Sequence, residues 1–243
     1  MIEFKDISKI YDGKTVVNKQ NFYIEKGEFF VLVGPSGSGK TTTLKMINRL
    51  IEPSNGEILI DGQTLGSLDL RKLRLNIGYV LQQIALFPNM TVMDNIELIP
   101  EMKKWKKANR DKRARELLLE VGMDPDKYLS RYPSELSGGE QQRVGILRAI
   151  SANPKILLMD EPFSALDPIS RNQLQDMILD IHEKFKMTIV FVTHDMHEAL
   201  KLGDRICVMR DGNIIQIDSP ENIINNPSSD FIREFFSLED RNE

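Results

Sequence analysis

The residues best suited to chemistry form a glycine loop near the N-terminus: Gly34, Pro35, Ser36, Gly37, Ser38, Gly39, Lys40 and Thr41. They fit the pattern G-x-x-x-x-G-K-[ST], in which glycines let backbone N–H groups turn inward around phosphate oxygens. In such loops the lysine places its charge between the β- and γ-phosphates, and the final hydroxyl takes one coordination position on Mg²⁺. The apolar run Phe29–Val33 precedes the loop and a helical stretch from Thr42 follows it, as the motif requires. A chance glycine turn is disfavoured by that context, so we expect residues 34–42 to bind nucleotide phosphate.

Two carboxylates end a second apolar run, Ile156–Met159, and these are Asp160 and Glu161. A buried strand that delivers a carboxylate at its C-terminal end suits a magnesium-bound triphosphate. We expect Asp160 to hold Mg²⁺, directly or through water, and Glu161 to act as general base on the attacking water. A strand that simply ends in a polar turn is the alternative.

His194 follows a third apolar run, Thr188–Thr193. Because the ends of parallel strands gather at one edge of a sheet, His194 is placed to reach the γ-phosphate and orient water there. The alternative is a polar residue that only caps its strand.

A second anion site is indicated by the signature segment, residues 136–143, with the sequence LSGGEQQR. Its hydroxyl, free backbone N–H groups and helix dipole can attract a phosphate, although a well-capped helix would look the same. A chain that already binds the nucleotide phosphates through residues 34–42 does not need a second phosphate-binding site for the same nucleotide. We therefore expect this helix end to face the γ-phosphate of another copy, so that nucleotide joins two chains head to tail. The residues assigned to it are Ser137, Gly138, Gly139 and Glu140.

Short apolar or β-branched runs alternate with helical stretches, which predicts an α/β fold with a mostly parallel core sheet. The expected strands cover residues 2–7, 16–24, 29–33, 57–60, 77–81, 156–159, 188–193, 205–209 and 213–218. Turn signals near the first two strands and residues 57–60 predict an antiparallel β subdomain there. Strand signals vanish between about residues 90 and 154, which favours an inserted helical subdomain, clearest at 113–121 and 139–151.

Composition narrows the classes of function. The formal charge is −4, so the basic excess of a dedicated nucleic-acid binder is missing. One cysteine and three histidines exclude an internal disulfide and make a structural zinc site improbable. No secretory signal or apolar run of membrane-spanning length occurs, which favours a cytosolic protein that can still dock on a membrane protein. The basic run 103–115 is interpreted as a solvated face, with anionic lipid or RNA contact as the alternative.

With these motifs in this order, nearly the whole chain, residues 1–243, resembles the ATP-binding subunits of ABC transporters. The resemblance implies a P-loop ABC ATPase that uses ATP and Mg²⁺, and the sequence departs from the pattern at no catalytic position. Tyr11 matches the aromatic residue that stacks on adenine, and Gln82 the glutamine that senses Mg²⁺ and the membrane partner. Asp167 lies in the loop that communicates across the dimer, and His194 matches the switch histidine.

The same resemblance implies partners. These are a second copy in an ATP sandwich dimer, transmembrane permease subunits at the cytoplasmic face of the membrane and, indirectly, an extracytoplasmic solute-binding protein. No nucleic-acid partner is expected. The segment 84–96 would border the groove for a membrane subunit, with exposed Leu86, Phe87 and Met90 as its apolar contact.

The segments TTTLKMINRLIEPSNGEILIDG and THDMHEALKLGDRICVMRDGNI are similar to those of importer ATPases for glycine betaine, carnitine and choline. Amino-acid importer ATPases share much of this pattern and stay an alternative. A non-transport ABC ATPase acting on DNA or ribosomes is a more distant one, because such proteins usually carry a coiled-coil insertion or two fused ATPase domains. Osmoprotectant ATPases often carry paired CBS modules after this domain; the sequence stops at Glu243, so a short form and a shortened chain are both open.

Overall fold

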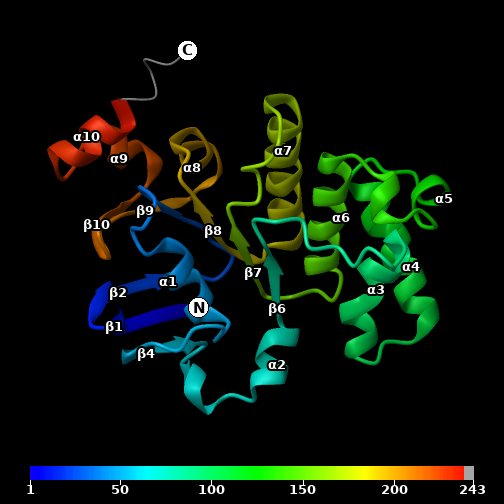
Figure 1. Cartoon of the computed structure of the whole chain (residues 1–243), viewed down its shortest axis with the longest axis horizontal. Coiled ribbons are helices and arrows are strands. Elements are labelled where there is room, and N and C mark those ends of the chain that lie inside the picture. The colour runs from blue at the N-terminus through cyan, green and yellow to red at the C-terminus, as the bar shows by residue number, and fades with distance from the viewer. Residues whose placement is uncertain (238–243) are drawn as a thin grey trace. The chain divides into compact units, whose positions relative to one another are not determined.

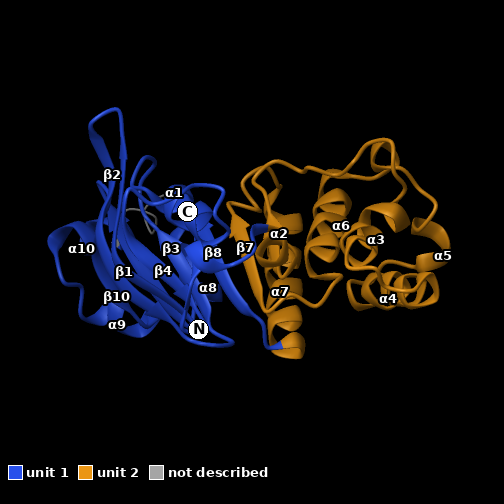
Figure 2. Ribbon diagram, turned by 90° about the horizontal axis from the view of Figure 1, so that it is seen from below, with its two compact units in different colours: residues 1–70, 186–243 blue, residues 71–185 orange. Residues whose placement is uncertain are grey.

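A computed structural model of the chain describes residues 1–237 (Figure 1). These residues fall into two compact units (Figure 2). Unit 1 combines residues 1–70 with the chain from Lys186 onward, and unit 2 is the continuous stretch Arg71–Phe185. Among the described residues, no helix is both long enough and apolar enough to cross a membrane.

The first sheet of unit 1 is antiparallel, with the strand order β2-β1-β4-β5. Its strands are β1 (Ile2–Tyr11), β2 (Lys14–Ile24), β4 (Asn55–Ile60) and β5 (Gln63–Thr64). In the tight turns Asp12-Gly13 and Asp61-Gly62 the aspartate and the glycine each have a positive φ, which is the backbone conformation of two-residue hairpin turns. The antiparallel subsheet expected from these turn signals is present, with the two-residue strand β5 in addition.

The second group of strands in unit 1 has the order β10-β9-β3-β8. Its members are β3 (Phe29–Val33), β8 (Thr188–Thr193), β9 (Arg205–Arg210) and β10 (Asn213–Asp218). β3 lies between β8 and β9 and is parallel to both, while β10 returns antiparallel to β9. All five residues of β3 are fully buried, which explains its uninterrupted apolar sequence. Val33 pairs with Thr193, so the segments that follow β3 and β8 leave the same edge of the sheet.

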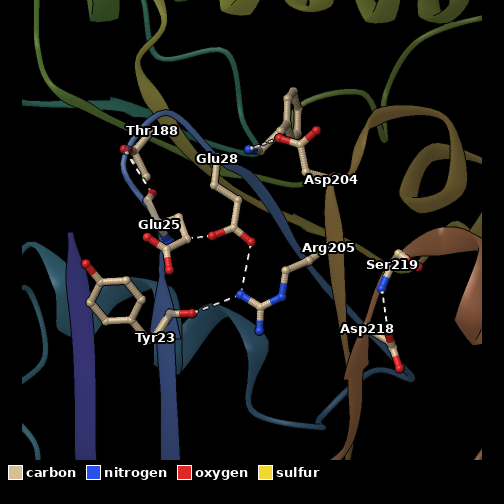
Figure 3. A network of polar contacts seen from close by, with 9 residues as sticks. Tyr23, Glu25, Glu28, Thr188, Asp204, Arg205, Asp218 and Ser219 are labelled. Atoms are coloured by element: carbon tan, nitrogen blue, oxygen red, sulfur yellow. Dashed lines mark hydrogen bonds and ion pairs between the residues drawn. The ribbon is translucent and has the colours of Figure 1, made fainter.

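A polar network joins the turn before β3 to the neighbouring strands (Figure 3). The Arg205 guanidinium donates to Glu28 Oε1 at 3.1 Å and to the Tyr23 carbonyl at 3.1 Å. Burial raises the pKa of Glu28, although the backbone N–H of Glu25 and the charge of Arg205 oppose that change. Asp204 Oδ2 accepts from the Phe29 N–H at 2.8 Å. These contacts fix where β3 begins and hence where the glycine loop after it emerges.

The helices of unit 1 are short. α1 follows the glycine loop, α8 follows β8, and the last two follow β10. They span α1 (Lys40–Ile47), α8 (Met196–Leu202), α9 (Pro220–Asn225) and α10 (Asp230–Ser237). The helix α2 (Leu70–Leu75) begins at the junction with unit 2.

Unit 2 holds the parallel strands β6 (Ile77–Val80) and β7 (Ile156–Asp160) together with most of the helices. The helices are α3 (Val92–Met102), α4 (Lys107–Glu120), α5 (Pro125–Tyr128), α6 (Gly138–Ile150) and α7 (Pro168–Phe185). A side chain at Gly78 would place its Cβ 2.6 Å from the Ala149 carbonyl oxygen, so α6 packs closely against β6. Residues 90–154 contain helices and no strand; their delimitation as an inserted subdomain stays a prediction.

The basic run 103–115 is mostly the solvated face that was expected. Its exposed cations are Lys104, Lys106, Lys107, Lys112 and Arg115, whereas Lys103, Arg110 and Arg113 are half-buried. Lys103 Nζ donates to the Ala152 carbonyl at 3.2 Å, and Arg113 Nε donates to the Ser151 carbonyl at 3.3 Å. Arg110 pairs with two acids of α3. The three half-buried cations of the run thus make contacts within unit 2, which their spacing alone does not reveal.

Candidate functional site

The glycine loop, residues 34–41, connects β3 to α1 within unit 1. Its backbone is tightly constrained: a Cβ at Gly34 would lie 2.1 Å from the Met209 carbonyl oxygen, and φ is +151° there. A Cβ at Gly39, where φ is +99°, would lie 2.7 Å from the Val16 carbonyl oxygen. Because β9 and β2 leave no room for side chains, only glycine lets the chain curl at these two positions.

Lys40 is 5% exposed, and its ammonium group is held by the loop itself. Nζ donates to the carbonyl oxygens of Gly34 at 2.6 Å and Pro35 at 2.9 Å, with Ser38 Oγ at 3.4 Å. Ser36 and Gly37 are exposed at the tip, whereas Thr41 and Thr42 are half-buried in the first turn of α1. A cation framed by loop backbone at a helix N-terminus is an arrangement that attracts phosphate.

His194 is exposed directly after Thr193, the residue that pairs with Val33. It therefore follows the strand next to the one that carries the glycine loop. The Thr193 hydroxyl accepts from the Asp195 N–H at 3.0 Å and donates to Glu198 Oε2 at 2.6 Å. Glu198, which sequence reasoning missed, thus shapes the turn that presents His194. The D-x-x-E spacing at the start of a helix was the available signal.

Tyr11, expected to stack on adenine, ends β1 and is 40% exposed. The Lys9 ammonium lies 4.8 Å from the centre of its ring. Unit 1 therefore contains Tyr11, the glycine loop and His194, and unit 2 contains the other expected site residues.

In unit 2, Asp160 is the last residue of β7 and is 5% exposed. Burial is the main cause of the raised pKa of Tyr79 on the neighbouring strand β6, and the negative charge of Asp160 raises it further. The next residue, Glu161, has φ +45°, which is uncommon for a side chain of this kind and strains the backbone at a place where chemistry was expected. Gln82 Nε2 lies 3.5 Å from Glu161 Oε2. Gln82, Asp160 and Glu161 therefore follow or end two adjacent parallel strands.

The turn after Glu161 is held from α6. Gln142, which is 2% exposed, donates from Nε2 to the Pro162 carbonyl at 2.7 Å. Asp167 lies just before α7, and its Oδ1 accepts from the Ser170 N–H at 3.0 Å. Hydrogen bonds from Ser170 lower the pKa of Asp167. The sequence offered no reason to single out Gln142, since its partner lies 20 residues away.

The signature segment opens α6 with a reciprocal cap. Ser137 Oγ accepts from the Glu140 N–H at 3.3 Å, and Glu140 Oε2 accepts from the Ser137 N–H at 2.7 Å. Ser137 and Gly138 are exposed, and Gly139 and Glu140 are half-buried. The residues named for a second anion site thus form the N-terminus of a helix of 13 residues.

A cavity of about 360 Å³ lies within unit 2, and Leu81, Ala85, Phe87, Leu98 and Arg148 are among the residues that line it. The Arg148 guanidinium donates to the Ala85 carbonyl at 2.7 Å and lies 5.8 Å from the centre of the Phe87 ring. Burial lowers the pKa of Arg148. Phe87 is 46% exposed as expected, but Leu86 and Met90 are half-buried, so the expectation of three exposed apolar side chains is wrong for those two.

The sequence profile of the ABC transporter family matches residues 17–164. The chain belongs to the ABC transporter family. This confirms the resemblance seen in the motifs, and the strand orders agree with the expected P-loop ABC ATPase fold. A dimeric structure of an ATP-binding cassette in a post-hydrolysis state, bound to ADP and Pi, matches with a TM-score of 0.81. The two sequences are 35% identical, and the match covers 90% of this chain and 99% of that one.

Curated relatives of this ABC family chain are named as transport ATP-binding proteins. The glycine betaine/carnitine/choline transport ATP-binding protein OpuCA of Bacillus subtilis is 53% identical over 98% of this chain and 63% of its own length. The glycine betaine uptake system ATP-binding protein YehX of Escherichia coli is 46% identical over 97% of this chain and 76% of its own length. The chain thus spans less than two thirds of the length of the first of these relatives.

Proposed function

We propose that the chain binds and hydrolyses ATP as the energising subunit of an ABC importer. The observation that carries this proposal is the glycine loop with the buried Lys40 at the start of α1. The backbone of the loop, the Lys40 ammonium group and the helix dipole together suit a nucleoside triphosphate better than any other ligand class. The full chain 1–243 would form one ATPase domain, with the helical subdomain at about residues 90–154.

The other site residues would divide the chemistry. Residues 34–42 would bind the phosphates, and Tyr11 would stack on the adenine. Mg²⁺ would be held by Thr41, Gln82 and Asp160, whose hydroxyl, amide and carboxylate oxygens are the hard ligands that this cation prefers. When bound, Mg²⁺ would offset negative charge on the β- and γ-phosphates.

Hydrolysis needs a base and a way to orient water. Glu161 would take a proton from the attacking water, and His194 would orient that water against the γ-phosphate. Ser137, Gly138, Gly139 and Glu140 of a second copy would close on the same phosphate, and Asp167 would relay the closure across the dimer. The dimeric state of the ADP- and Pi-bound cassette supports this arrangement.

The transported solute would be a quaternary amine such as glycine betaine, carnitine or choline. Support comes from the names of OpuCA and YehX. The apolar cavity beside Phe87 is suited to a helix of a permease subunit, which would hold the chain at the cytoplasmic face of the membrane. An extracytoplasmic solute-binding protein would contribute indirectly, and no nucleic acid is required.

ATP hydrolysis by the full chain tests the catalytic part. Lys40→Ala should abolish nucleotide binding. Glu161→Gln should keep ATP binding and, because hydrolysis stops, accumulate an ATP-bound dimer visible by analytical ultracentrifugation. Wild-type turnover in Glu161→Gln would remove Glu161 from the role of base.

Uptake of labelled glycine betaine or carnitine at high salt tests the solute class. Cells that lack other osmoprotectant importers would carry either the wild-type chain or Lys40→Ala. Loss of uptake with the variant is expected; unchanged uptake would redirect the search to amino acids. ATPase activity stimulated by duplex DNA or ribosomes, but not by membrane subunits, would instead favour a non-transport role.

A further inference from the structure

The N-terminal cap of α6 determines which hydrogen bond the Ser137 hydroxyl can still make. Its oxygen accepts the Glu140 N–H, and a serine hydroxyl that accepts one bond still has its single proton to donate. Ser137 is exposed, so that proton is available beyond the end of the helix. The direction in which it points depends on how firmly Glu140 holds the Ser137 backbone.

Glu140 is itself held from outside α6. The hydroxyl of Tyr128, at the end of α5, donates to Glu140 Oε1 at 2.5 Å, while Oε2 accepts the Ser137 N–H. The two oxygens of one carboxylate are thus divided between the cap and the tyrosine. The Tyr128 bond is the largest cause of the lowered pKa of Glu140, and the same contact raises the pKa of Tyr128.

The tyrosine is anchored in turn. The Arg131 guanidinium lies 4.7 Å from the centre of the Tyr128 ring, and the Arg131 N–H donates to the Tyr128 carbonyl at 3.0 Å. The Arg131 carbonyl accepts the Val92 N–H at 2.8 Å, which ties this turn to the start of α3. Tyr128 therefore reaches Glu140 from a backbone position that is already fixed.

We propose that Tyr128 is a positioning residue for the signature serine: through Glu140 it holds Ser137 so that the hydroxyl donates to the γ-phosphate bound by a second copy. This inference rests on the proposed ATP sandwich dimer. Tyr128 acts only through the Glu140 carboxylate and touches no nucleotide. Its removal should therefore weaken dimer closure without weakening the binding of ATP to a single chain.

The test uses the full chain in the Glu161→Gln background. ATP-driven dimerisation is followed by analytical ultracentrifugation, and ATP binding to the monomer by a fluorescent ATP analogue at low protein concentration. Tyr128→Phe keeps the ring over Arg131 and removes only the hydroxyl. We expect it to raise the ATP concentration for half-dimerisation about five- to tenfold, the effect of losing a partly exposed hydrogen bond to a carboxylate. Tyr132→Phe removes the same atom from an exposed ring four residues later and is the matched control.

Coupling separates positioning from general destabilisation. In a Glu140→Ala background Tyr128→Phe should have no further effect, because the connecting carboxylate is gone. Glu140→Gln can still cap Ser137 and accept from Tyr128, so it should stay sensitive to Tyr128→Phe whatever its own level of dimerisation.

Equal dimerisation of the parent and Tyr128→Phe would overturn the positioning role and leave the proposed function intact. An effect of Tyr128→Phe that persists undiminished in Glu140→Ala would also overturn it. A Glu161→Gln parent that binds no ATP and forms no dimer would instead overturn the proposed function, and the role of Tyr128 with it.

Discussion

The Glu97 side chain provides a pH-dependent test of how α3 packs on α4. Glu97 is 7% exposed, and its Oε2 accepts from Arg110 Nε at 3.2 Å. Its Oε1 and Asp111 Oδ1 are both shielded from solvent, and neither oxygen accepts a hydrogen bond from a donor group of the described residues. Burial first, then Asp111, raise the pKa of Glu97 to about 7, although Arg110 and Lys107 oppose the rise. We therefore expect Glu97 to keep its proton at pH 6, where its carboxyl group can share that proton with Asp111.

The sign of the effect follows from linkage. A carboxyl whose pKa is raised in the folded state contributes stability that is complete below the ordinary value of 4.5 and is lost as pH rises through about 7. At about 1.4 kcal/mol for each unit of pH, the rise from 4.5 to about 7 limits the loss to about 3.5 kcal/mol. Because Arg110 stays beside the group, we expect about 1–3 kcal/mol. Glu97→Gln cannot ionise, so its stability should not show this loss.

The assay is urea unfolding of wild type and Glu97→Gln at pH 5, 6, 7 and 8. Any constant cost of the substitution cancels when the difference in unfolding free energy is compared between pH values. That difference should move in favour of Glu97→Gln as pH rises. Glu101→Gln, which alters the exposed second partner of Arg110, is the control and should follow the wild-type profile. Parallel profiles for wild type and Glu97→Gln would refute the shared proton.

Two further substitutions, Gly34→Ala and Arg205→Ala, test the packing of unit 1, and each is paired with a control substitution. Gly34→Ala should prevent stable folding or cost several kcal/mol, because its Cβ would lie 2.1 Å from a carbonyl oxygen of β9. Gly145→Ala, inside α6 with nothing within 4 Å of an added Cβ, should instead raise the melting temperature slightly. Arg205→Ala should cost about 1–3 kcal/mol in urea unfolding, because the buried Glu28 loses its counter-charge. Arg233→Ala removes an exposed ion pair and should change stability by less than about 0.5 kcal/mol; equal losses in the two arginine variants would contradict this view of the network.

The elements that carry the expected site were predictable because local sequence determines them. A glycine loop between an apolar strand and a helix is a short local pattern, and so is an acid or a histidine at the end of a strand. The expected strand over Phe29–Val33 and that over Thr188–Thr193 match the structure at both ends. Burial of β3 and β8 on both faces explains why these apolar runs were unambiguous.

What sequence reasoning missed depends on contacts between distant residues. Gln142 resembles an ordinary helix residue until its partner, the Pro162 carbonyl 20 residues away, is known. The inward turn of Lys103 likewise depends on a carbonyl at Ala152. Side chains of this kind support a site from behind, and no local pattern distinguishes them from solvated ones.

The discontinuity of unit 1 has a consequence for synthesis on the ribosome. Phe29 pairs with Ile189, so the most apolar strand of the unit is translated about 160 residues before its first parallel partner. At the usual rates of elongation that interval lasts roughly ten to thirty seconds. Unit 2, by contrast, is one uninterrupted stretch, and its strands β6 and β7 can pair while the C-terminal part of unit 1 is still missing. The nascent chain therefore carries an unpaired FFVLV segment while about 160 further residues are made, and we expect aggregation during synthesis to begin there.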